Sequence, residues 1–216
     1  TKTVMKYPKR IILGIGGTHP DFLCACFRLM ERGTKTKISS VGRVELKSKF
    51  KNETLDARLG GIKDLKLSYD YHETEVSHIW YNEYENFPSK FLIINVKHEI
   101  LDPIFEMFEQ KIKNTNLLFK YWPTKLINYL KSKNISSKEI FKAFSIDNLK
   151  KFYNCKNLQV IEINNIYNKS HVIELLKSNN VYNKQYEDKF NQFYDDWYNK
   201  NKQYINKINM YYNENK

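Results

Sequence analysis

The stretch from Arg10 to Met30, RIILGIGGTHPDFLCACFRLM, limits most strongly how this chain can fold. It begins with a short apolar run, continues with three glycines and ends in a segment whose apolar residues recur at helical spacing. The apolar run is typical of a buried strand, and glycines allow backbone paths that side chains block. Thr18 or Asp21 can cap the helix, and Pro20 suits its first turn. We therefore predict a strand, a tight turn and a helix in direct succession.

The predicted turn is a candidate anion site. In a strand–turn–helix unit, backbone N–H groups and the positive end of the helix dipole point at the turn, so a phosphate can bind there. The candidate binding residues are Gly14, Gly16, Gly17, Thr18 and His19. A Walker A motif that began at Gly14 would need glycine, lysine and a hydroxyl residue at positions 19–21. The chain has His-Pro-Asp there, so that motif is excluded. A plain connection between a strand and a helix uses the same glycines and stays open as the alternative.

Further along the chain, apolar segments alternate with helical ones. Strand patterns cover 75–80, 91–96 and 159–163, and helical patterns cover 101–112, 123–130, 136–144 and 172–176. Such alternation predicts an α/β fold in which a parallel sheet is flanked by helices. Ligands of these folds bind beyond the carboxyl ends of the strands. His78, Lys97 and His98 are expected there together with the glycine loop.

The segment 184–212 has aromatic and apolar residues spaced by threes, fours and one seven, which predicts a long amphipathic helix. Interleaved basic and aromatic residues also occur on nucleic-acid-binding surfaces. We favour an aromatic stripe packed on the sheet, with lysines and asparagines facing water. No internal repeat or Gly/Ser linker separates this helix from the rest, so residues 1–216 are predicted to form a single domain.

The composition limits the partners and the compartment. A hydrophobic content of 41% is enough for a real core, and the net charge of +12 favours anionic partners such as nucleotides or nucleic acid. AT-rich coding would produce the same lysine-rich and asparagine-rich composition without selection for a basic surface. Three cysteines form no disulfide framework, which favours a reducing, cytoplasmic setting, and Cys24 and Cys26 are expected in the core. No apolar stretch approaches the roughly 20 residues that cross a bilayer, so no membrane partner is expected.

Taken together, the order of these segments resembles that of P-loop sulfotransferases, and particularly of the divergent sulfotransferase-like proteins of phages and marine bacteria. The likeness covers 10–30, 75–113 and, more loosely, 159–201. In that family, the loop after the first strand holds a basic residue, a small residue, Gly and Thr, and it binds the 5′-phosphosulfate end of 3′-phosphoadenosine 5′-phosphosulfate. Gly17 and Thr18 match the last two positions, whereas Ile15 and Gly16 occupy the first two. The resemblance implies a three-layer, P-loop NTPase-like sandwich.

The resemblance also implies roles for two residues outside the loop. A histidine after the next sheet strand is the usual general base, and His78 in VSHIW holds the similar position. Lys97 stands where the family has an arginine that holds the 3′-phosphate of the cofactor. The serine that follows this arginine and the late Arg-Lys-Gly signature of the family have no counterpart here.

Two functions follow as hypotheses. The first is a sulfotransferase-like protein of the cytoplasm of a bacterial or virus-infected cell, which transfers a sulfuryl group to a hydroxyl or amine of a small molecule or glycan. The second is a catalytically inactive α/β protein that binds nucleic acid or a protein partner. A small-molecule kinase fits less well, because the loop has no lysine. No metal is expected, since the spacing of His72, Glu73, Glu75 and His78 fits no zinc motif.

Overall fold

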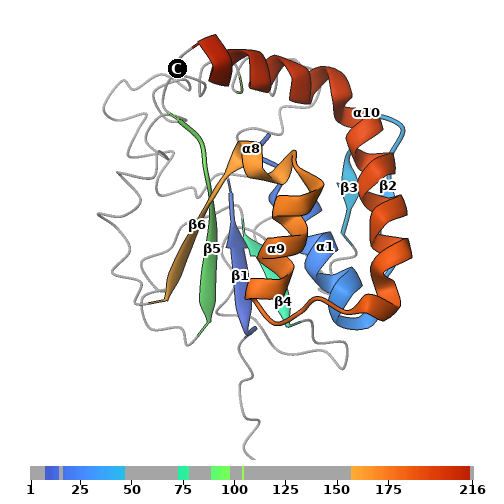
Figure 1. Ribbon diagram of the computed structural model, residues 1–216. Coiled ribbons are helices and arrows are strands. Elements are labelled where there is room, and N and C mark those ends of the chain that lie inside the picture. Colours follow the sequence, from blue (N-terminus) through green and yellow to red (C-terminus); the bar gives the residue numbers. More distant parts are fainter. Residues whose placement is uncertain are drawn as a thin grey trace, which may run out of the picture.

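A four-stranded parallel sheet forms the centre of the computed structural model (Figure 1), which describes residues 8–14, 17–46, 73–77, 89–97, 104 and 157–214. Its strands are β1 (Arg10–Leu13), β4 (Thr74–Ser77), β5 (Lys90–Asn95) and β6 (Leu158–Glu162). They lie in the order β4-β1-β5-β6, and each neighbouring pair is parallel. The predicted α/β fold with a parallel sheet is confirmed.

The register of the strands places their carboxyl ends at one edge of the sheet. Leu13 at the end of β1 pairs with Ser77 at the end of β4 and with Ile93 of β5, which continues to Asn95. Of the described strands, β4 follows β1 in the chain and lies on one side of it. The next strand, β5, lies on the other side of β1, and β6 lies beyond β5. The carboxyl ends of β1 and β5 therefore flank a topological switch point, which is where open α/β sheets bind their ligands.

Helix α1 (Pro20–Arg32) follows β1 at the predicted place, with Pro20 in its first turn. Its N-cap is His19, in a left-handed conformation and without a side-chain capping hydrogen bond, so the prediction of Thr18 or Asp21 as the cap is wrong. The helix ends at the left-handed Gly33, whose N–H donates to the Leu29 carbonyl over 2.7 Å. Its middle turns are buried throughout, and Cys24 and Cys26 are core residues as predicted.

Between α1 and β4, the strands β2 (Lys37–Ile38) and β3 (Val44–Glu45) form a small antiparallel hairpin. The turn between them closes with a 3.0 Å hydrogen bond from the Gly42 N–H to the Ser39 carbonyl. The Gly42 carbonyl in turn accepts a 3.0 Å hydrogen bond from the side chain of Asn201. The hairpin is thus tied to the last helix of the chain.

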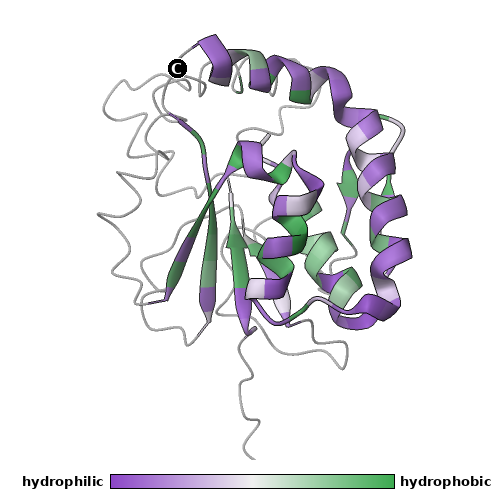
Figure 2. Cartoon of the chain, viewed as in Figure 1, coloured by the Kyte–Doolittle hydropathy of each residue, from purple (hydrophilic) through white to green (hydrophobic). Residues whose placement is uncertain are grey.

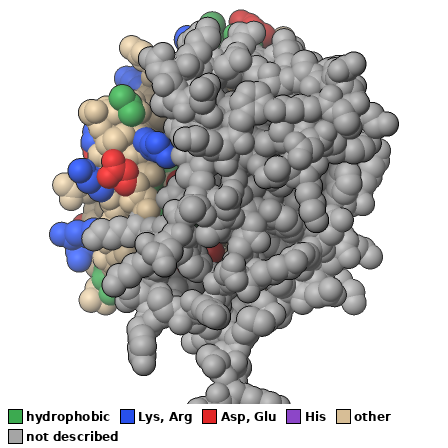
Figure 3. All heavy atoms as spheres, turned by 180° about the vertical axis from the view of Figure 1, so that it is seen from behind, with side chains coloured by type: hydrophobic (Ala, Val, Ile, Leu, Met, Phe, Trp, Pro, Cys, Tyr) green, Lys and Arg blue, Asp and Glu red, His purple; other side chains and the backbone are tan. Residues whose placement is uncertain are grey.

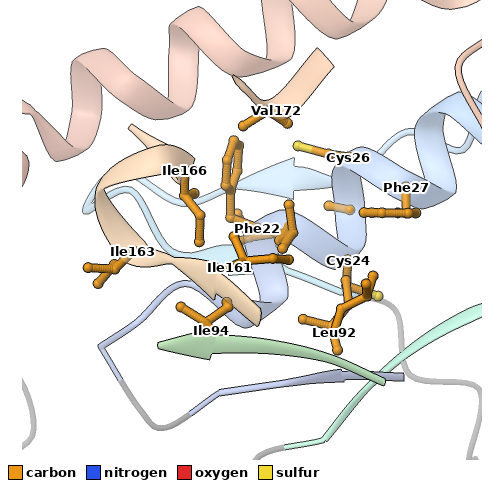
Figure 4. Close-up of a cluster of buried hydrophobic side chains, with 14 of the residues drawn as sticks. Phe22, Cys24, Cys26, Phe27, Leu92, Ile94, Ile161, Ile163, Ile166 and Val172 are labelled. Carbon is orange, nitrogen blue, oxygen red and sulfur yellow. The ribbon is translucent and has the colours of Figure 1, made fainter. Parts of the chain in front are cut away.

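After β6 the described chain is helical, with α8 (Ile163–Ile166), α9 (Lys169–Ser178), the 3₁₀ turn η3 (Lys184–Tyr186) and α10 (Glu187–Glu214). The side chain of Asn168 caps α9 by accepting from the N–H groups of Ser170 and His171. Side chains of α1, α8 and α9 gather over β5 and β6 in one apolar cluster (Figure 4). The predicted long helix near the end of the chain is confirmed. In the part of the chain that the structure describes, no helix is long and apolar enough to span a membrane.

The aromatic stripe of α10 faces inward, and its outer side is mostly hydrophilic (Figure 2). Its buried members are Phe190, Phe193, Tyr194, Trp197, Tyr204 and Tyr212. The stripe is buried, as predicted, but its main partner is helix α1 and not the predicted sheet, because α1 itself packs on β1 and β4. The helices predicted at 101–112, 123–130 and 136–144 lie outside the described residues, apart from the buried, helical Ile104.

Candidate functional site

The glycine loop leaves the carboxyl end of β1 and is tightly packed. A Cβ atom on Gly14 would lie 2.8 Å from the hydroxyl oxygen of Thr18 and 3.1 Å from Cβ of Pro20. Real Cβ atoms do not approach other atoms so closely, and the Thr18 side chain is fully buried. Position 14 therefore requires glycine, because the end of the loop folds back over it.

Two residues of the loop have left-handed backbones. Gly17 has a φ of 87° and His19 a φ of 62°. Glycine adopts this conformation readily, whereas a residue with a Cβ atom adopts it at a cost of roughly 1 to 2 kcal/mol. Such a residue persists only where its surroundings hold it. Contacts from other parts of the fold must therefore stabilise the left-handed backbone of His19, where the loop joins α1.

Three aromatic rings supply those contacts by enclosing the ring of His19. The centroid of its imidazole lies 5.7 Å from that of Tyr167, 5.1 Å from that of Trp197 and 5.2 Å from that of Tyr204. All three contacts are edge-on, with interplanar angles between 74° and 85°. The sequence marked His19 as a cofactor ligand, and the structure places its ring between α10 and the end of α8. Its role toward a cofactor stays a prediction.

The hydroxyl of Tyr204 binds the loop directly. It donates a 2.7 Å hydrogen bond to the carbonyl oxygen of Gly17. Burial raises the pKa of Tyr204, so its hydroxyl stays protonated and can donate at physiological pH. Tyr194, further back on the same helix, makes a similar 2.9 Å hydrogen bond to the carbonyl oxygen of Ile166. Helix α10 is therefore held by one buried tyrosine at the glycine loop and by another at α8.

Lys97 lies at the same edge of the sheet, two residues beyond the end of β5. Its side chain is exposed, and its ammonium nitrogen lies 5.0 Å from the ring centroid of Tyr212 near the end of α10. Next to it, the Asn95 amide donates a 2.7 Å hydrogen bond to Glu162, which joins the ends of β5 and β6. The edge beyond β5 thus carries a cation, as the sequence predicted.

The described residues bring together Gly14, Gly17, Thr18 and His19 in one loop and place Lys97 on the same edge. Gly16 and His78 lie outside the described residues, so their predicted roles stay predictions. The contacts of Trp197 and Tyr204 with the loop were not predicted from the sequence. The two residues are seven positions, or two helical turns, apart, so they lie on one face of the helix. This spacing was the sequence signal that both could contact the same segment.

A second polar cluster lies at the opposite, amino-terminal edge of the sheet. The Arg10 guanidinium donates a 3.0 Å hydrogen bond to the Glu31 carboxylate, which also accepts from the hydroxyl of Thr74. Arg28 donates to the Thr74 carbonyl over 3.0 Å and to the Glu75 carboxylate over 2.6 Å. Burial raises the pKa of Glu31 despite these partners. This buried cluster joins β1, β4 and α1 and thereby supports the scaffold of the loop.

Among the residues described, no group of three His, Cys, Asp or Glu side chains is arranged to hold a metal ion. Comparisons with protein-family models, curated proteins and solved structures gave no match to this chain. The function has to be argued from the loop and the edge of the sheet.

Proposed function

We propose that this chain binds 3′-phosphoadenosine 5′-phosphosulfate at the Gly14–Thr18 loop and transfers its sulfuryl group to a hydroxyl or amine acceptor. One observation carries the proposal: the loop joins the carboxyl end of the inner strand β1 to the N-terminus of the 13-residue helix α1. Backbone N–H groups and the positive end of the helix dipole meet at such a junction. An anionic phosphate is the ligand that this arrangement suits.

The donor groups available at the edge fit a phosphate. Thr18 contributes through its backbone, because its side chain is buried against the loop. The loop itself has no basic residue, so the compensating charge comes from Lys97 beyond the adjacent strand β5. An ammonium group on a flexible stem is a common phosphate partner. Open α/β sheets bind their ligands at the switch point, here between β1 and β5, so we assign both contributions to one nucleotide.

The proposed chemistry assigns one further task to the chain. When bound, the cofactor supplies a sulfuryl group, whose S–O bond to the 5′-phosphate breaks as a bond from sulfur to the acceptor oxygen or nitrogen forms. We assign His78, which follows Ser77 in the chain, to accept the proton that the acceptor loses, as suits a histidine near neutral pH. Lys97 offsets the charge on the departing nucleotide. Positioning and electrostatics of this kind are what group transfer requires of the protein.

Binding is tested by calorimetry with 3′-phosphoadenosine 5′-phosphate. The full chain should bind it in the micromolar range, and Lys97→Ala should weaken binding about tenfold, because one charge-assisted contact is lost. Lys177→Ala is the matched control, since Lys177 also lies over a tyrosine ring, at 4.9 Å from the centroid of Tyr182. It should leave the affinity unchanged. Absence of binding to the full chain would overturn the nucleotide proposal, and equal losses in both variants would remove the role of Lys97.

Transfer is tested by following donor turnover with a panel of simple phenols, alcohols and amines. His78→Ala should abolish turnover and still bind 3′-phosphoadenosine 5′-phosphate. Full turnover in that variant would refute the base assignment. Binding without turnover by any acceptor would instead favour the non-catalytic hypothesis.

On the face seen from behind, the described side chains give the nucleic-acid alternative no specific support. Figure 3, seen from behind, shows Lys and Arg side chains next to acidic and hydrophobic ones on the described part of that face. Nucleic-acid binding rests on a basic patch or stripe and weakens steeply with salt. If the chain bound DNA or RNA in a salt-dependent way and did not bind 3′-phosphoadenosine 5′-phosphate, the nucleic-acid alternative would be supported instead.

A further inference from the structure

Besides its ring contacts with His19, helix α10 makes a hydrogen bond to one peptide unit of the glycine loop. The Tyr204 hydroxyl donates its 2.7 Å hydrogen bond to the carbonyl oxygen of Gly17. Peptide units are planar, and none in the described part of the chain is cis, so the C=O and the following N–H point in opposite directions. With the Gly17 carbonyl turned toward Tyr204, the N–H of Thr18 points to the side of the loop away from α10.

The Gly17–Thr18 peptide turns about ψ of Gly17 and φ of Thr18. Gly17, at a φ of 87°, has no Cβ atom and therefore restricts its ψ less than other residues do. Rotation of the peptide would turn the Thr18 N–H toward α10 and would break the hydrogen bond from Tyr204. The tyrosine hydroxyl therefore stabilises the observed orientation of this peptide.

The tyrosine is itself held firmly. Trp197, two turns earlier on α10, is almost fully buried and stacks on Phe22 of α1, with 3.5 Å between the ring centroids. The ring of Tyr204 also lies against that of His19, at 5.2 Å. The hydroxyl thus reaches the loop from a rigid support, as a positioning group requires.

We propose that Tyr204 is a positioning residue, which orients the Gly17–Thr18 peptide so that the loop presents its N–H groups to the phosphate of a nucleotide. This inference rests on the proposed nucleotide binding by the same loop and adds to that site a residue of α10, 187 positions away in the chain. Tyr204 acts through the loop and has no contact with the nucleotide in this proposal.

The test compares two variants that each remove one buried hydroxyl from α10. Tyr204→Phe keeps the ring and loses the bond to Gly17, whereas Tyr194→Phe loses the equivalent 2.9 Å bond to the Ile166 carbonyl. Both should lower the melting temperature by a similar amount. Tyr204→Phe should also weaken binding of 3′-phosphoadenosine 5′-phosphate about three- to tenfold, the range expected for one hydrogen bond. Tyr194→Phe should bind it as the unchanged chain does.

A second readout needs no nucleotide. Amide hydrogen exchange of the peptide that covers residues 14–21 should become faster in Tyr204→Phe and stay unchanged in Tyr194→Phe. Unchanged exchange in Tyr204→Phe, or equal losses of affinity in both variants, would overturn the inference. If the unchanged chain binds no nucleotide, the proposed function fails, and the exchange experiment alone decides whether Tyr204 orders the loop.

Discussion

The indole ring of Trp197 lies almost parallel to the ring of Phe22, with 3.5 Å between the ring centroids and 9° between the planes. Both side chains are buried, at 1% exposure each. The contact joins the last helix of the fold to the first turn of α1, directly after the glycine loop. The loop and α10 are therefore parts of one packed unit.

Truncation of this contact should destabilise the whole fold. Trp197→Ala should lower the free energy of unfolding by about 3 to 5 kcal/mol, because it removes a buried aromatic side chain and leaves a cavity. Urea denaturation followed by circular dichroism measures the change. Tyr198→Ala on the same helix is the control and should cost less, since Tyr198 is only partly buried. A loss below about 1 kcal/mol for Trp197→Ala would contradict the packing described here.

Gly14→Ala should destabilise the chain by about 1 to 3 kcal/mol, because the added Cβ atom overlaps with Thr18 and Pro20. The same substitution should cost less in a chain that already carries Thr18→Ala, since the closest clashing atom is then absent. A double-mutant cycle from urea denaturation measures this coupling. Equal costs in the two backgrounds would show that the two residues do not meet.

The buried carboxyl of Glu31 should make stability depend on pH. Its pKa is raised in the folded state from an ordinary value of 4.5, so folding favours its protonated form. That contribution is fully present below about pH 4.5 and is lost as the pH rises through the higher folded pKa. Glu31→Gln removes the titrating group. The unfolding free energy of the unchanged chain, minus that of Glu31→Gln, should therefore fall as the pH rises from 4 toward neutrality.

Urea denaturation at a series of pH values measures this difference. A difference that stays flat over this pH range would show that Glu31 is not buried as described.

Glu75→Gln should cost about 2 kcal/mol, because it leaves the buried Arg28 guanidinium without its charged partner at 2.6 Å. Asp196→Asn removes the exposed partner of Lys200, at 3.1 Å, and should change stability by less than about 0.5 kcal/mol. Thermal and urea denaturation at moderate salt compare the two. Equally small losses of stability in the two variants would show that the Arg28 guanidinium is exposed to solvent.

The sequence predicted the elements whose signals are local. The apolar run before Gly14 and the helical spacing after Pro20 specify β1 and α1, because both patterns depend on neighbouring residues alone. The long helix at 187–214 was found in the same way, from the period of its aromatic residues. The parallel sheet followed from the alternation of such segments.

The details of the site depend on contacts between distant residues and could not be predicted. Local preference favours Thr18 or Asp21 as the helix cap, yet His19 takes that position because Tyr167, Trp197 and Tyr204 surround its ring. The hydrogen bond from Tyr204 to Gly17 is likewise a tertiary contact that no local pattern encodes.

The central claim, that the glycine loop holds a nucleotide phosphate, is tested most directly by calorimetry of 3′-phosphoadenosine 5′-phosphate with Gly17→Val and Gly33→Val. Both variants place a β-branched side chain at a positive φ, of 87° and 67° respectively, so both carry backbone strain. Gly33 lies at the end of α1 opposite the loop, where the added side chain meets the partly buried Tyr186. We expect micromolar binding by the unchanged chain and by Gly33→Val, and none by Gly17→Val; binding that survives in Gly17→Val, or none in the unchanged chain, would contradict the claim.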